Sequence, residues 1–322
     1  MSTKRMLALF LIMMLMAGSL FMIGCQPEDV IDEPVDEPVE EPVDVEVVVG
    51  SKEFTEQLIL GQVTILALEY HGFKVVDETG LGGTVIAREA QEAGEIDIYW
   101  EYTGTALINY FGFDVMTDPE ETYALVKETD YERNGLVWLD YTPFNNTYAV
   151  MMRVADAELL GIETISDLAA AINAGESAPD PGTWIFGSNH EYSTRDDGYP
   201  GMLEHYGFEF DSVDVMDYGI IYSALRDGDL AAAMCFATDG RIPAFDLVVL
   251  VDDLQFHPVY NCAPVVRQEI MEAAPQIADI LNPIARALDA DTMAMLNMMV
   301  DIDDYLPREV AEEWLKEQGF IS

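Results

Sequence analysis

The stretch GEIDIYWEYTGTA (residues 94–106) predicts a buried strand that ends in a helix. Residues 96–99 are apolar and partly β-branched except for Asp97, which is enough for a buried strand. Small polar residues, Thr103, Gly104 and Thr105, come next, and an apolar run restarts at Ala106. Such a turn exposes backbone N–H groups that favour an anion. The alternative is a tight turn beside a half-buried Tyr102.

Strands and helices alternate on both sides of this stretch. Strands are predicted at 45–50, 73–77, 137–139, 148–154, 184–187, 213–216 and 230–236, and helices at 55–70, 84–93, 164–174, 200–206 and 222–227. A further helix begins at Asp118, and four more follow between 268 and 318. This order predicts an α/β fold with mainly parallel sheets. It fits two α/β lobes joined by two crossing strands, with a ligand at the carboxyl ends of strands.

The chain is strongly acidic. Its 60 Asp and Glu residues against 15 Lys and Arg residues give a formal net charge of −45 over 322 residues. Such a charge repels nucleic acid and anionic lipid headgroups, so neither is expected as a partner. One interpretation is a saline habitat, where salt screens the repulsion. The other is an acidic surface that only aids solubility.

The N-terminus has the pattern of a lipoprotein signal peptide, residues 1–25. Lys4 and Arg5 precede an apolar run at 6–21, and MIGC at 22–25 resembles a lipobox whose Cys25 would be lipidated. An uncleaved membrane helix is the alternative. Residues 26–44 repeat an acidic four-residue unit ending in proline, which predicts an extended tether or a tail without a role.

No sequence pattern of an enzyme or a metal site is present. HExxH, G-x-S-x-G and paired CxxC motifs are absent, the four histidines are scattered, and the methionines show no metal-binding spacing. We therefore expect no catalysis, no metal and no cofactor. Cys235 and Cys262 form either a disulfide or two buried free thiols.

Several motifs, taken in order, resemble the extracellular substrate-binding proteins of ABC importers for glycine betaine, choline and related quaternary amines. No one motif is decisive, but the ordered set is specific and extends from about Val47 to the C-terminus. The motifs, with residues 94–106, are SKEFTEQ (51–57), LGGT (81–84), FNNTY (144–148), RDDG (195–198), ATDGRI (237–242) and PVYN (258–261).

The resemblance implies the two-lobed periplasmic-binding-protein fold of type II, with two crossing hinge strands. Lobe 1 would comprise residues 45–147 and 255–322, and lobe 2 residues 148–254. The resemblance also implies an aromatic cage, because a quaternary ammonium cannot donate hydrogen bonds but is attracted to ring faces. The cage falls on Tyr102, Tyr148, Phe236 and Tyr260. Phe236 departs from the family's tyrosine and loses its phenol oxygen.

A ligand carboxylate needs donors, which the resemblance places on Lys52, Thr105 and Arg195. Arginine can hold a carboxylate with two parallel N–H bonds. The alternatives are a salt bridge from Arg195 to Asp196 or Asp197, and a solvated Lys52. Asn146 is expected to support the cage from the backbone side.

The resemblance implies an extracytoplasmic, lipid-anchored, monomeric protein that delivers glycine betaine or a related quaternary amine to an ABC permease and its ATPase. Choline or carnitine could replace betaine, and a solute sensor could use the same fold. Retention of Lys52 and Arg195 favours a ligand with a carboxylate.

Overall fold

The structure is a computed structural model and describes residues 45–322. Two five-stranded sheets organise these residues. The first has the strand order β2-β1-β3-β10-β4 and comprises β1 (Glu46–Gly50), β2 (Lys74–Glu78), β3 (Ile98–Tyr102), β4 (Leu136–Trp138) and β10 (Cys262–Arg267). The second has the order β7-β6-β8-β5-β9 and comprises β5 (Tyr148–Arg153), β6 (Ile185–Ser188), β7 (Ser212–Val215), β8 (Ala232–Phe236) and β9 (Leu247–Val249).

The two sheets share one pattern of pairing. In the first, β1 pairs in parallel with β2 and β3, whereas β10 is antiparallel to β3 and β4. In the second, β6 pairs in parallel with β7 and β8, whereas β5 is antiparallel to β8 and β9. The fold is therefore α/β with two lobes, as predicted. The prediction of mainly parallel sheets is wrong, because β10 and β5 run antiparallel to both of their neighbours and make each sheet mixed.

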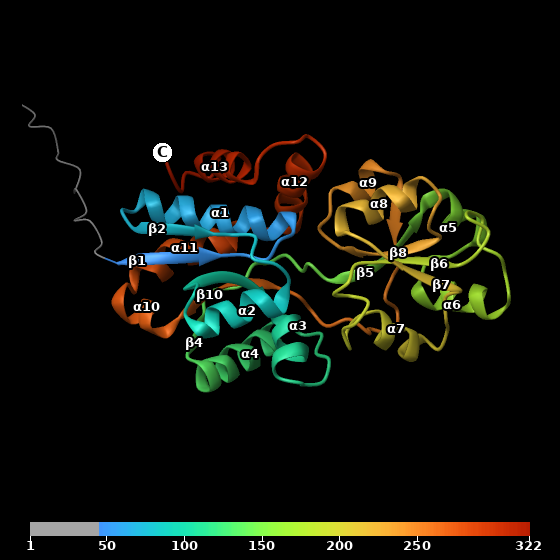
Figure 1. The fold of residues 1–322 in the computed structure, drawn as a ribbon, viewed down its shortest axis with the longest axis horizontal. Helices are drawn as coiled ribbons and strands as arrows, with labels where there is room; N and C mark the ends of the chain where they lie inside the picture. The colour runs from blue at the N-terminus through green and yellow to red at the C-terminus, as the bar shows by residue number, and fades with distance from the viewer. Residues whose placement is uncertain (1–44) are drawn as a thin grey trace, which may run out of the picture. The chain divides into compact units, whose positions relative to one another are not determined.

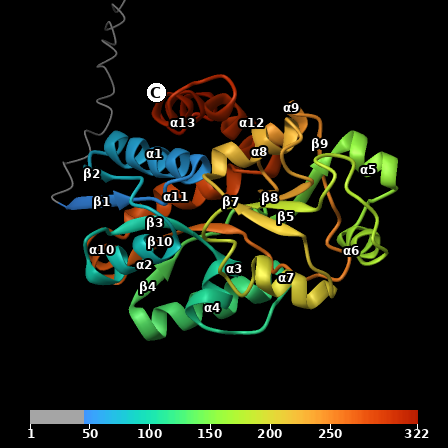
Figure 2. The ribbon, with the colours of Figure 1, turned by 45° about the vertical axis from the view of Figure 1, so that its right-hand side comes forward.

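Helices cover both faces of each sheet. Figures 1 and 2 show α1 on one side of the first sheet and α2 and α4 on the other. The helices near the first sheet are α1 (Thr55–Tyr70), α2 (Thr84–Ala93), α3 (Thr103–Thr105), the π-helix η1 (Ala106–Tyr110), α4 (Pro119–Asn134), α10 (Gln268–Ala273), α11 (Gln276–Ala287), α12 (Ala290–Asp301) and α13 (Pro307–Glu317). Those near the second are α5 (Val154–Leu160), α6 (Ile165–Asn173), α7 (Tyr199–Tyr206), α8 (Tyr218–Arg226) and α9 (Arg241–Ala244).

Local sequence signals explain several helix ends. Asp118 caps α4 by accepting a 2.9 Å hydrogen bond from the backbone N–H of Glu121, and Pro119 occupies the first helical position. The predicted capping box at Thr164 and Asp167 begins α6. Helix α2 ends at Gly94, whose left-handed conformation glycine adopts without steric cost.

The decisive strand is longer than predicted and begins later. β3 runs from Ile98 to Tyr102 rather than over 96–99, because it pairs with β10 from Val266 opposite Ile98 to Cys262 opposite Tyr102. This pairing keeps Tyr102 in the sheet and almost fully buried. The alternative interpretation, a tight turn beside a half-buried Tyr102, is therefore wrong. α8 also begins earlier than predicted, at Tyr218, and α5 and α9 were not predicted.

The chain passes between the two sheets twice, after β4 and after β9. These crossing segments pair with each other at Asn145 and Asn261, and the backbone N–H of Asn146 donates a 3.1 Å bond to the carbonyl of Tyr260. Two segments far apart in sequence therefore form a short two-stranded connection at the position expected for a hinge.

The two candidate disulfide partners lie in different sheets. Cys235 is in β8 and Cys262 is in β10, and both are buried free thiols. The disulfide alternative is therefore wrong and the free-thiol alternative is confirmed. The predicted signal peptide with Cys25 and the predicted tether lie outside the described residues. None of the helices within 45–322 has the length and apolar run that crossing a bilayer requires.

Candidate functional site

A cavity of about 1350 Å³ contains all the side chains that the sequence analysis singled out for ligand binding. Its walls come from the ends of β3, β5 and β8, from the crossing segments, and from the loops that precede α1, α2 and α7. The eight predicted residues that line it are Lys52, Tyr102, Thr105, Asn146, Tyr148, Arg195, Phe236 and Tyr260.

One predicted cage ring, Tyr148, contacts two of the other three directly. Tyr148 begins β5 and stands opposite Phe236, the last residue of β8, in the antiparallel register, and their ring centroids are 5.0 Å apart. Tyr260, on the second crossing segment, meets Tyr148 edge-on at 5.5 Å. Tyr102 joins through Phe54, whose ring lies 6.3 Å from Tyr102 and 5.1 Å from Phe236. The rings thus form one aromatic cluster at the wall of the cavity.

Two further aromatic rings extend this cluster. Phe54 belongs to the 51–57 motif but carried no signal that separates a cavity ring from a core ring. Tyr218 begins α8 and lies 4.9 Å from Phe236, and its hydroxyl donates a 2.7 Å bond to Asp239. Nothing in the sequence around Tyr218 distinguishes it from the other tyrosines of the chain.

Lys52 is buried, so the interpretation of a solvated turn residue is wrong. Its ammonium donates bonds of 2.7 Å to Oε1 of Glu101 and 3.0 Å to the hydroxyl of Thr84. It also lies 5.2 Å from the ring centroid of Tyr102. These two bonds use two of the three N–H donors of the ammonium and leave one for a further acceptor.

Arg195 makes the salt bridge that the sequence analysis gave as the alternative to ligand binding. Its Nε and Nη2 atoms donate to Oδ1 and Oδ2 of Asp197 at 2.7 and 2.6 Å, and Nη1 donates to Oε1 of Glu191 at 2.7 Å. The guanidinium carbon lies 5.3 Å from the ring centroid of Tyr148. A positive charge of the protein therefore already faces a ring of the cluster.

Asp197 joins this cation to the rings. Its Oδ2 also accepts a 2.6 Å hydrogen bond from the hydroxyl of Tyr260. Burial acts to raise the pKa of Asp197, but the bonds and the charge of Arg195 and the bond from Tyr260 outweigh it and hold the pKa below its usual value. Asp197 is therefore an ionised carboxylate that fixes both Arg195 and the ring of Tyr260.

A buried carboxylate on α1, Glu56, holds the opposite side of the cluster. Its Oε1 accepts bonds of 2.7 Å from the Tyr102 hydroxyl and 2.7 Å from the Asn146 amide, and its Oε2 lies 2.6 Å from the Thr238 hydroxyl. Burial raises the pKa of Glu56 despite these hydrogen bonds. The sequence analysis missed Glu56 because it is one of many acids in the chain, but it predicted a supporting place for Asn146.

The turn after β3 differs in one respect from the prediction of free backbone donors. The N–H of Thr103 donates a 3.0 Å bond to the carbonyl of Asn261, so this amide is not available to an anion. Gly104 packs so closely on the second crossing segment that an added Cβ would lie 2.7 Å from the carbonyl oxygen of Val259. Thr105 is buried at the cavity wall. Between residues 45 and 322 no group of His, Cys, Asp or Glu side chains is arranged to hold a metal ion.

The sequence matches one protein family over almost all of the described residues. The family described as the substrate binding domain of ABC-type glycine betaine transport system matches residues 45–317. A glycine-betaine-binding protein of Pseudomonas aeruginosa is 44% identical over 275 residues, which are 85% of this chain and 88% of the relative. The glycine betaine-binding protein YehZ of Escherichia coli is 32% identical and covers 85% of this chain and 91% of its own.

A solved structure of a related protein has a similar fold. The crystal structure of a glycine betaine/carnitine/choline ABC transporter matches with a TM-score of 0.70 and 30% identity, over 86% of this chain and all of the other. The family match over residues 45–317 includes both sheets and both crossing segments. The chain therefore belongs to the family of extracytoplasmic substrate-binding domains of ABC-type glycine betaine transport systems, which bind solutes for import and are not enzymes.

Proposed function

We propose that this protein captures glycine betaine or a closely related quaternary amine and delivers it to an ABC permease. The observation that supports this most directly is the cluster of four predicted cage rings on one cavity wall. A trimethylammonium group has a diffuse positive charge and an apolar surface, and ring faces match both properties.

The magnitudes agree with reversible capture. Four ring contacts at about 1–2 kcal/mol each contribute roughly 4–8 kcal/mol before ordering costs. Association and side-chain ordering reduce this gain, so a dissociation constant of about micromolar or weaker is expected. Such binding allows release to a permease.

Lys52, Thr105 and Arg195 would hold the carboxylate of betaine, and Asn146 would support the rings. Arg195 and Phe236 belong to the half of the chain that forms the second sheet, whereas Lys52, Tyr102 and Thr105 belong to the first. Closure about the crossing segments would therefore complete the site.

Outside the described residues, we propose that Cys25 is lipidated and becomes the first residue of the mature chain once residues 1–24 are cleaved off. Residues 26–44 would then tether the domain to the outer face of the membrane. The lipobox pattern and the repeated proline support this arrangement. Mass spectrometry of the protein after expression in a bacterial host should find a lipid-modified Cys25 as the first residue, and an unmodified Cys25 would contradict it.

Calorimetric titration of the purified protein with glycine betaine, choline and carnitine tests the binding function. We expect saturable binding of at least glycine betaine, and losses of about tenfold or more in Tyr102→Ala and in Tyr260→Ala with unchanged circular dichroism, because each removes one whole ring face. Unchanged affinity in both variants would remove the cage.

A further inference from the structure

Glu191 reaches across the cavity from the lobe of the second sheet to the lobe of the first. It lies in the turn that follows β6, and its Oε1 accepts the 2.7 Å bond from Nη1 of Arg195. Its Oε2 would lie 3.1 Å from a Cβ added to Gly83, the residue that caps the N-terminus of α2. One carboxylate therefore touches a cation of one lobe and the start of a helix of the other.

The groups around this carboxylate are those that bind anions. Thr84, the first residue of α2, accepts a bond from Lys52 and contributes a hydrogen bond to Glu191. Burial acts to raise the pKa of Glu191, but the charges of Lys52 and Arg195 and the bonds from Thr84 and Arg195 bring the pKa below its usual value. The side chain is therefore ionised and lies in the field of both cations.

The carboxylates outnumber the cations at this place. Lys52 is paired with Glu101 and Arg195 with Asp197, and both of these acids have fully buried side chains. Glu191 is the third carboxylate, and its side chain keeps 31% of its surface exposed. Of the three, Glu191 is the one that a ligand can displace without leaving a buried charge behind.

We propose that Glu191 is a specificity-determining residue that occupies the anion position between Lys52 and Arg195 and competes there with the carboxylate of a ligand. The inference rests on the proposed function. It implies that a zwitterion such as glycine betaine must displace Glu191, whereas a quaternary amine without a carboxylate, such as choline, leaves Glu191 in place and gains its negative charge.

Titration of Glu191→Gln with glycine betaine and with choline tests this competition. The substitution removes the negative charge of Glu191, which competes with the ligand carboxylate. The dissociation constant for glycine betaine should therefore fall by about tenfold, the factor expected for one charge-assisted hydrogen bond. The dissociation constant for choline should stay the same or rise. Glu158→Gln, the same substitution at an exposed position of α5 outside the cavity, should change neither.

The outcomes separate the two proposals. If the dissociation constants for glycine betaine and choline change by the same factor, Glu191 acts on closure of the lobes, and competition with the ligand carboxylate is excluded. Unchanged or weaker binding of glycine betaine in Glu191→Gln and in Glu191→Ala, with wild-type melting temperatures, overturns the inference and leaves the proposed function intact. If neither wild type nor variant binds either ligand, the proposed function fails and the inference fails with it.

Discussion

The hydroxyl of Tyr102 donates a 2.7 Å hydrogen bond to Oε1 of Glu56, and this bond ties a ring of the cavity wall to the first turn of α1. Glu56 also binds Asn146 on the first crossing segment and Thr238 after β8. One buried carboxylate thereby connects three parts of the chain that meet at the cavity. The orientation of the Tyr102 ring depends on a residue that is not itself on the predicted list of ligand contacts.

Tyr102→Phe removes this bond and keeps the ring. We expect glycine betaine to bind about three- to tenfold more weakly, because the ring loses its anchor and Glu56 loses one of its donors, a change of about 0.5–1.5 kcal/mol. Isothermal titration calorimetry measures the change. The melting temperature reports separately whether the variant remains folded.

A double-mutant cycle with Glu56→Gln tests whether the two residues act together. If Glu56 acts through the Tyr102 hydroxyl, the double variant should bind glycine betaine little worse than the weaker single variant. Glu69→Gln serves as the control, because it makes the same substitution on α1 at an exposed residue paired with Arg308. Fully additive losses would show that Glu56 affects binding by another route.

The sequence predicts the rings of the cavity better than its charges. Tyr102, Tyr148 and Tyr260 fall on recognisable motifs, and two strand ends and the second crossing segment place them at one cavity. The acids that neutralise the cavity's cations could not be predicted, because 60 acidic residues offer too many partners for Lys52 and Arg195. Only Asp196 and Asp197 are candidates from the sequence, since they follow Arg195 directly in the chain, and Asp197 is the partner in the structure. Glu101 reaches Lys52, 49 residues away in the chain, through the fold alone. Glu191 lies only four residues before Arg195, but nothing in the sequence separates it from the other acids nearby.

The bounds of β3 also could not be predicted from the local sequence. The predicted strand at 96–99 was chosen for local apolar character, whereas β3 extends to Tyr102 because β10, more than 150 residues later in the chain, supplies its partner. The polar side chain of Glu101 does not end the strand, because Lys52 and the hydroxyl of Tyr99 bind it inside the protein. Non-local pairing of this kind leaves no trace in a short window of sequence.

Gly104→Ala should weaken ligand binding through Tyr260. A Cβ at position 104 would lie 2.8 and 2.9 Å from two ring atoms of Tyr260 and 2.7 Å from the carbonyl oxygen of Val259. Since a real Cβ does not approach so closely, either the ring or the crossing segment must move. We expect at least a tenfold loss of glycine betaine affinity, about 1.4 kcal/mol. Wild-type affinity in a folded Gly104→Ala protein would show that the position of Tyr260 does not control binding.

Asp197 should make the fold sensitive to acid. Its pKa is lower in the folded protein than the ordinary value of about 3.9, so its stabilising contribution is complete above pH ~4 and is lost as the pH falls through the folded pKa. Asp197→Asn leaves the buried guanidinium of Arg195 without its bidentate partner, which costs about 3–5 kcal/mol at pH 7. Urea unfolding at pH 7 and at pH 3 measures the effect. The difference between wild type and variant should shrink at pH 3, and an equal difference at both pH values would contradict the assignment.

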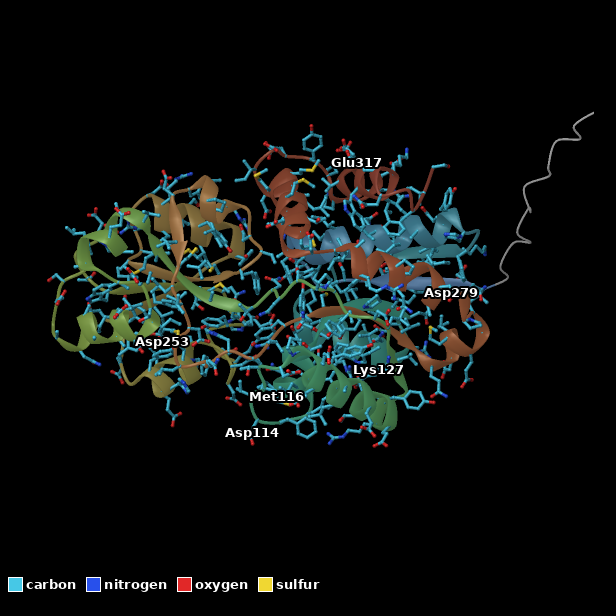
Figure 3. All side chains as sticks on the ribbon, turned by 180° about the vertical axis from the view of Figure 1, so that it is seen from behind. Asp114, Met116, Lys127, Asp253, Asp279 and Glu317 are labelled. Carbon is cyan, nitrogen blue, oxygen red and sulfur yellow. The ribbon has the colours of Figure 1, made fainter. Side chains whose placement is uncertain are left out.

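The acidic surface should make stability depend on salt. Exposed carboxylates such as Asp114, Asp253, Asp279 and Glu317 are distributed over widely separated parts of the described surface (Figure 3). Their repulsion extends over about 30 Å at 0.01 M salt but only about 3 Å at 1 M, whereas buried pairs such as Arg195 with Asp197 are screened much less.

Raising sodium chloride from ~0.01 M to ~1 M should therefore increase the melting temperature, because screening removes more repulsion between surface acids than attraction within buried pairs. Differential scanning calorimetry measures the shift, and sucrose at equal osmolarity separates charge screening from solute exclusion. If melting and circular dichroism stay the same across this range, the acidic surface serves solubility alone. If sodium chloride raises the melting temperature and sucrose does not, the result favours adaptation to a saline habitat. Only in a saline habitat would the net charge of −45 cost little stability.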